Sequence, residues 1–126
     1  MKALLLHHVS LPVANLERSK AFYGEVLRLQ EITRPDFDFE GAWYQIGEGQ
    51  LHLIVDESMP MKAEQHIDSR QLHFALRVED YHETADWLKK HGIQLVEKPD
   101  SKSGFAQIFC CDPDGHIIEL HVEQPL

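Results

Sequence analysis

The chain has 126 residues, 43% of them hydrophobic, which is enough for one compact domain with its own core and too few for two ordinary domains. With a formal net charge of −9 and no run of lysine or arginine, it lacks the basic surface that nucleic acids and anionic membranes attract. No apolar run is long enough to span a bilayer, and the apolar start at residues 1–6 is too short for a signal peptide, so we expect a cytoplasmic protein.

The first part of the chain predicts a strand, a helix and three more strands. Residues 4–13 end in alternating polar and apolar side chains, as a strand with one buried face does. Asn15 is a suitable N-cap for a helix that carries apolar residues at helical spacing to about Leu27. The strands that follow are expected over residues 29–33, 42–46 and 51–55.

The second part repeats this plan after a linker at about 57–70. Placing His73 under His8 without a gap aligns the apolar residues of the two opening strands. The match continues into the helices, where Asp80 takes the N-cap position of Asn15. Gly92 is placed to end the second helix, and a short strand over residues 93–96 repeats the one at 29–33.

The last strand of each half aligns as well. In the second half it follows Asp112-Pro113-Asp114-Gly115, a tight-turn signal, and it places Glu119 under His52. We therefore expect two βαβββ modules, over about residues 4–56 and 71–126. Because each module alone would bury little surface, the modules must pair with each other or with those of a second chain. The expected fold is α+β, a single domain over residues 1–126 with curved, mixed sheets.

Four side chains of the repeat share the strand face opposite the aliphatic one, by the period of two along a strand. They are His8, His52, His73 and Glu119. Imidazoles and a carboxylate that converge make a ligand set for Zn, Ni, Mn, Co or Fe(II), and open coordination positions would admit a substrate. The alternatives are that His8 and His73 are half-buried and bonded to backbone groups, and that His52 is an acid or base beside the metal.

Other residues permit two interpretations each. His121 shares the face of Glu119 and either orients a ligand or is a partly exposed strand-end residue. Arg77 either meets an anionic substrate or forms a surface salt bridge. The aromatic group Phe37, Phe39, Trp43 and Tyr44 either lines a pocket or belongs to the core. The adjacent Cys110 and Cys111 suit neither a disulfide nor a zinc knuckle, and we interpret them as core residues.

Three stretches resemble the vicinal oxygen chelate superfamily, which includes glyoxalase I, fosfomycin-resistance proteins, methylmalonyl-CoA epimerase and extradiol dioxygenases. They are residues 8–13 with 19–27, residues 72–76, and the turn at 112–115 before Ile118-Glu119-Leu120. The resemblance implies paired βαβββ modules around a divalent metal, with His8, His73 and Glu119 at the usual ligand positions. At the fourth position, glyoxalase I has Glu and the epimerase Gln, whereas this chain has His52.

The resemblance therefore implies a metal-dependent glyoxalase-like enzyme of the lyase or isomerase type. Its metal would chelate two neighbouring oxygens of a small-molecule substrate and stabilise the oxyanion formed when a proton moves, with Glu119 or His52 as the base. By analogy the protein is expected to be a homodimer. The alternatives are thiol transfer to fosfomycin, extradiol dioxygenase activity, and a non-catalytic ligand-binding resistance protein.

Overall fold

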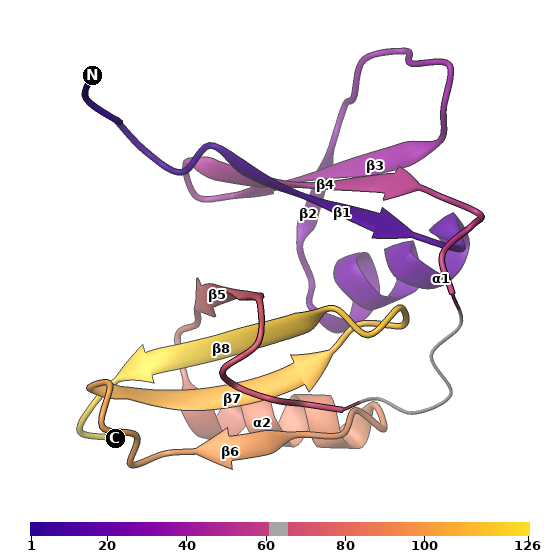
Figure 1. The fold of residues 1–126 in the computed structure, drawn as a ribbon. Coiled ribbons are helices and arrows are strands. Elements are labelled where there is room, and N and C mark those ends of the chain that lie inside the picture. Colours follow the sequence, from indigo (N-terminus) through magenta and orange to yellow (C-terminus); the bar gives the residue numbers. More distant parts are fainter. Residues whose placement is uncertain (61–65) are drawn as a thin grey trace. The chain divides into compact units, whose positions relative to one another are not determined.

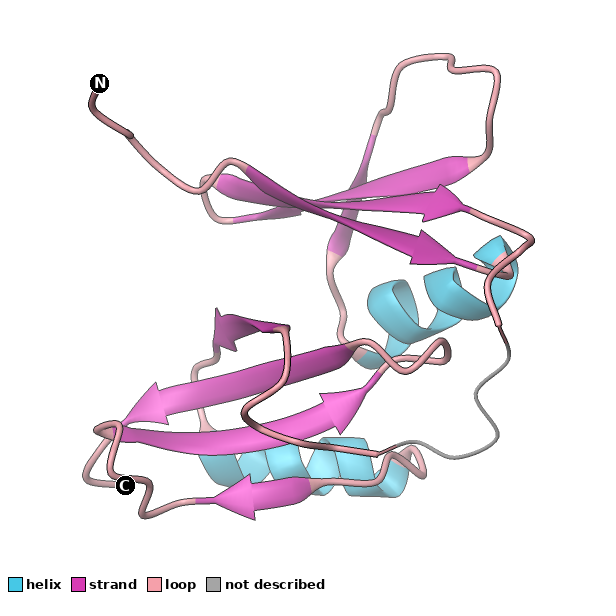
Figure 2. Ribbon diagram, in the orientation of Figure 1, coloured by secondary structure: helices cyan, strands magenta, loops and turns pink. Residues whose placement is uncertain are grey.

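The computed structural model describes residues 1–60 and 66–126, so the middle of the expected linker lies outside the described residues. The chain divides into two compact units, Met1–Met61 and Lys62–Leu126. Each unit contains a helical segment and a four-stranded mixed sheet (Figures 1 and 2). This confirms the expected α+β class and the repeat of two modules.

The first unit is built around the sheet β1-β4-β3-β2. Its elements are β1 (His8–Val13), α1 (Leu16–Lys20), η1 (Ala21–Val26), β2 (Gln30–Ile32), β3 (Gly41–Ile46) and β4 (Gly49–Val55). The first strand runs parallel to β4, and the remaining neighbours are antiparallel. The first and last strands of the module are therefore adjacent, which sets His8 and His52 on neighbouring strands.

The helical segment of the first unit begins where the sequence predicts it. The Asn15 side chain accepts a hydrogen bond from the Arg18 backbone N–H, as an N-cap does. After α1 the helix continues as the π-helix η1, in which the wider turn brings Leu27 N–H to Phe22 O at 2.9 Å. The buried Phe22 and Tyr23 lie on this segment, and the Tyr23 ring contacts Tyr44 of β3. The helix therefore covers one face of its sheet.

The second unit has the same order, with the sheet β5-β8-β7-β6. Its elements are β5 (His73–Arg77), α2 (Tyr81–Lys90), β6 (Val96–Lys98), β7 (Phe105–Cys111) and β8 (Ile117–Glu123). Asp80 caps α2 by accepting from Glu83 N–H, and Gly92 follows the helix with a φ of 74°. Figure 1 shows α2 along one face of this sheet.

The turn before β8 is held by a buried carboxylate. Asp112 is fully buried, and its Oδ1 accepts from the backbone N–H groups of Asp114 and His116, at 2.9 and 2.8 Å. Gly115 supplies the positive φ of 89° that the turn requires. The turn thus fixes the residue at which β8 starts, and with it the face on which Glu119 lies.

The other face of the second sheet is covered at one end. Phe109, Cys111 and Ile117 form a buried apolar cluster there, with Ile67 and Val96 packed against it. Phe109 and Ile117 share this face with Glu119, because Phe109 pairs directly with Glu119 and Ile117 precedes it by two residues. Apolar packing therefore surrounds a carboxylate on the face away from the aliphatic residues Ile118 and Leu120.

The first strand is shorter than the sequence predicts, and β2 and β6 have three residues each where 29–33 and 93–96 were expected. We expected a strand over residues 4–13, but β1 begins at His8, and Leu4, Leu5 and Leu6 are exposed. The physical reason is the length of the partner strand: His8 pairs with Gln50, and β4 itself begins at Gly49. The three leucines precede the first register pair and have no cross-strand partner in β4, so their hydrophobicity alone misled the prediction.

Candidate metal centre

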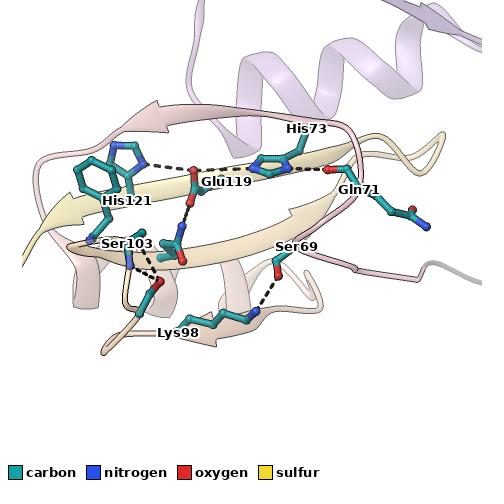
Figure 3. A network of polar contacts seen from close by, with 10 residues as sticks. Ser69, Gln71, His73, Lys98, Ser103, Glu119 and His121 are labelled. Atoms are coloured by element: carbon teal, nitrogen blue, oxygen red, sulfur yellow. Dashed lines mark hydrogen bonds and ion pairs between the residues drawn. The ribbon is translucent and has the colours of Figure 1, made fainter.

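Glu119 is a buried carboxylate with polar neighbours on both sides. It is 6% exposed in the middle of β8, between β5 and β7. Its Oε2 lies 4.0 Å from His73 Nε2 and 3.5 Å from His121 Nδ1, and its Oε1 accepts a hydrogen bond from the Gln107 amide (Figure 3). A buried carboxylate needs such partners, because an unpaired charge away from water is costly.

The orientation of His73 follows from its backbone contact. His73 Nδ1 lies 2.7 Å from Gln71 O, and a carbonyl oxygen can only accept, so Nδ1 carries the proton. The lone pair of the neutral ring is then on Nε2, which faces Glu119 Oε2. Two acceptors that face each other in this way are stabilised by a proton or a cation between them, and here Glu119 is buried while His73 is 26% exposed.

His121 lies against Glu119 from the other side. Its ring stacks on Phe105 at 4.4 Å between centroids and 13° between planes, and its Nδ1 is buried without a hydrogen bond among the described residues. The sequence left open whether His121 orients a ligand or merely ends a strand. Its burial and its contact with Glu119 favour the orienting role. Arg77, in contrast, forms the surface salt bridge that was one of its two interpretations, with Glu123 at 3.0 Å.

In the first unit, His8 and His52 form a stacked pair. The register pairs His8 with Gln50 and Ser10 with His52, so both imidazoles lie on one face of the sheet, as the strand period predicts. Their ring centroids are 4.3 Å apart with 15° between the planes. On the other side of His52, the ring of Trp43 stacks at 3.9 Å and 3°.

The surroundings of His52 favour its neutral form. It is 7% exposed, and its Nε2 lies 2.8 Å from Gln50 Oε1. Burial, with smaller contributions from His8 and His7, lowers the pKa of His52 from its ordinary value. His7 lies beside His8, with its Nδ1 2.9 Å from His8 Nδ1. A neutral imidazole is the form that binds a metal or accepts a proton.

The four predicted residues therefore fall into two pairs, His8 with His52 in the first unit and His73 with Glu119 in the second. Across residues 1–60 and 66–126, no group of three or more His, Cys, Asp or Glu side chains is assembled for a metal. The second pair nevertheless suits a cation, since an ion about 2.1 Å from each of two ligand atoms keeps them roughly 3–4 Å apart. The donor chemistry of imidazole nitrogen with carboxylate oxygen fits Zn, Mn, Ni, Co or Fe(II).

The sequence missed the residues that support these pairs. Nothing in the strand pattern marked Gln107 as the donor to Glu119. The aromatic group divides between its two interpretations: Tyr44 is core, whereas Phe37 and Phe39 are 41% and 42% exposed. Trp43 does neither, because its ring covers His52.

Comparisons with known proteins agree with this architecture. Residues 5–120 match the model of the Glyoxalase/Bleomycin resistance protein/Dioxygenase superfamily. Glutathione transferase FosA of Serratia marcescens is 31% identical over 117 residues, which cover 93% of this chain and 79% of that protein. Glyoxylase I 4 of Arabidopsis thaliana is 33% identical over 122 residues, 91% of this chain and 68% of that protein. The crystal structure of the glyoxalase family protein from Enterococcus faecalis superposes with a TM-score of 0.71 at 27% identity, covering 94% and 97% of the two chains.

The chain therefore belongs to the Glyoxalase/Bleomycin resistance protein/Dioxygenase superfamily. This confirms the resemblance drawn from the motifs, and the neighbouring structure confirms the fold. Its relatives include proteins named as glyoxalase-type and thiol-transferring enzymes. No helix in the described part of the chain is long and apolar enough to cross a membrane.

Proposed function

We propose that this chain is a metal-dependent enzyme of the glyoxalase type that moves a proton on a small substrate with two neighbouring oxygens. The observation that carries the proposal is the buried Glu119 carboxylate, whose Oε2 faces the lone pair of His73 Nε2 at 4.0 Å. A proton or a cation would satisfy both acceptors, and the proposal assigns a divalent ion to this place.

The proposal assigns His8, His73 and Glu119 as metal ligands, with His52 as a further ligand or a base beside the metal. The ion would supply Lewis-acid stabilisation of negative charge on the substrate oxygens. The chain's own groups would move the proton: a Glu119 oxygen or the neutral His52 ring can accept it. Gln107 would keep one Glu119 oxygen in place while the other is used.

The curated relatives support this class of chemistry. One is named Glyoxylase I 4, and the match covers most of this chain. We also propose that the protein is a homodimer, as the resemblance implies, and sedimentation of the purified chain at several concentrations would test this. A single monomeric species at all of them would contradict it.

The test of the metal site is elemental analysis of the purified chain beside the double variant His73→Ala, Glu119→Ala, after the same brief dialysis. We expect about one metal per site in the wild type and a loss in the variant. The matched control is His82→Ala, Glu83→Ala on α2, which removes the same two chemical groups elsewhere. Equal metal in all three proteins, including after reloading, would overturn the proposal.

A second candidate function is thiol transfer to fosfomycin, which the relative named glutathione transferase FosA favours. Against it, the serine hydroxyls before β7 bond within their own segment: the Ser101 hydroxyl donates to Ser103 Oγ, which also accepts from Phe105 N–H. Glutathione consumption in the presence of fosfomycin and added metal would decide. Consumption that is absent in the His73→Ala, Glu119→Ala variant would favour transfer over isomerisation.

A further inference from the structure

A chain of amide hydrogen bonds in the first unit ends on His52, and its direction is set at the turn between β3 and β4. Gln45 Nε2 donates to Gly47 O at 2.8 Å and to Gly49 O at 3.1 Å. Carbonyl oxygens only accept, so this end of the Gln45 amide must be its NH₂ group. Its Oε1 is therefore left as an acceptor, and it receives Gln50 Nε2 at 3.2 Å.

The hydrogen-bond chain continues from Gln50 to His52. Because the Gln50 NH₂ group is committed to Gln45, the atom that faces His52 is Gln50 Oε1, 2.8 Å from His52 Nε2. That oxygen can only accept, so His52 Nε2 carries the proton. In the neutral ring the lone pair is then on Nδ1. The carbonyl oxygens of Gly47 and Gly49 thus determine the tautomer of His52, which lies three to five residues further along the chain.

The stacking of the rings limits what His52 can ligate. A metal binds an imidazole nitrogen along its lone pair, which lies in the plane of the ring. The planes of His8 and His52 are within 15° of parallel and the centroids are 4.3 Å apart, so an ion in the plane of one ring lies well outside the plane of the other. Trp43 covers the opposite side of His52 at 3.9 Å, which opposes rotation of the ring.

From this geometry, and resting on the proposed function, we infer that Gln45 and Gln50 are positioning residues that hold His52 as its Nε2–H tautomer for proton transfer, and that His52 is not a metal ligand beside His8. The second unit contains a parallel case. Gln107 of β7, whose register partner is His121, donates to Glu119, which repeats His52. In both modules a glutamine of the third strand thus supports a functional side chain of the fourth, through Gln50 in the first unit and directly in the second.

The test is long-range ¹H–¹⁵N correlation NMR of metal-free protein labelled in its imidazole nitrogens, at a pH where the rings are neutral. We expect His52 to be almost entirely the Nε2–H tautomer. Gln50→Leu, which removes the acceptor, should give a mixture of tautomers. Gln45→Leu should do the same more weakly, although Gln45 does not touch His52. Gln50→Glu keeps an oxygen acceptor and should restore the Nε2–H form.

The result that would overturn the tautomer assignment is a wild-type His52 in the Nδ1–H form, or a tautomer that Gln50→Leu leaves unchanged in a folded protein. The ligand assignment has a separate test. His52→Phe keeps an aromatic ring in the stack and should retain the wild-type metal content, whereas His8→Ala should lose metal. Loss of metal in His52→Phe would make His52 a ligand. A wild type without metal would overturn the proposed function but leave the tautomer result standing.

Discussion

Gln107 on β7 donates a hydrogen bond from its amide to Oε1 of Glu119 on β8, and so holds one oxygen of a buried carboxylate while the other faces His73 and His121. The bond is diagonal across the sheet, since the residue paired directly with Glu119 is Phe109. The neutral Gln107 amide satisfies a buried oxygen of Glu119 and leaves the negative charge of the carboxylate, which attracts a metal ion or a proton.

Removal of this donor should destabilise the protein. Gln107→Leu leaves a buried carboxylate oxygen without its partner, which typically costs about 1–3 kcal/mol in the free energy of unfolding. Urea unfolding followed by circular dichroism measures the change. Gln30→Leu, on the exposed edge strand β2, is the matched control and should fall within about 0.5 kcal/mol of wild type. Equal effects of the two substitutions would contradict the role of Gln107.

Two glycines of the first sheet should differ sharply in their tolerance of alanine. A Cβ at Gly41 would lie 2.3 Å from Leu53 O, a backbone atom that cannot move aside without opening the β3–β4 pairing. Gly41→Ala should therefore lower the free energy of unfolding by about 1–3 kcal/mol or more, as overpacking usually does. At Gly49 the nearest atom is 3.4 Å away, an ordinary contact. Gly49→Ala should be much milder, and similar thermal midpoints for the two variants would contradict this.

Stability should fall at alkaline pH in part through Tyr81. Burial, with contributions from the hydrogen bond and charge of Glu97, raises the pKa of Tyr81 to about 12. The unfolded chain has a tyrosine pKa near 10, so it releases this proton first. The stabilisation is fully present below about pH 10 and is lost as the pH rises towards 12.

Tyr81→Phe should therefore lose less stability than wild type between pH 9 and pH 11, measured by urea unfolding at both values. At pH 9 the variant should already be weaker by about 1 kcal/mol, because the hydrogen bond from Tyr81 to Glu97 is absent. Tyr44, whose pKa burial also raises to about 12, keeps its own contribution in both proteins. The same loss in both proteins from pH 9 to pH 11 would exclude a contribution of Tyr81.

The cysteines should be unreactive in the folded protein. Cys110 and Cys111 are both buried, and burial raises the pKa of the Cys110 thiol to about 12. The thiolate is the reactive form, so a chromogenic thiol reagent at pH 8 should modify neither residue until the protein unfolds. Rapid labelling of one thiol per chain without loss of secondary structure would show that β7 opens locally.

The repeat and the strand faces could be predicted because they depend on local patterns. Val9, Leu11 and Val13 alternate with polar residues in β1, and the alternation alone identifies the face on which His8 lies. The N-caps Asn15 and Asp80 could also be predicted, because a short polar side chain before a helix can accept a hydrogen bond from the first backbone N–H groups. The core placement of Cys110 and Cys111 followed from their adjacency, which excluded a disulfide.

The rest depends on pairing between distant strands, which local patterns do not encode. Trp43 meets His52 only because β3 and β4 pair in a register that sets these residues opposite each other. The role of Asp112 was hidden for a different reason: the turn was evident from proline and glycine, but nothing showed that the aspartate would turn inward to bond the backbone. The π-helical continuation after Lys20 also has no signal in the apolar spacing.

The position of β8 in its sheet has a consequence for the order of events during synthesis. This strand, residues 117–123, is the last element of its unit, yet it lies between β5 and β7 and supplies the pairing partner of β5. Until residues 117–123 have been made, the strand that carries His73 has no partner within the unit, although α2, β6 and β7 come earlier in the chain. The nascent chain must therefore keep β5 available until Glu119 arrives, and the buried acid reaches its histidine in the same step that closes the sheet.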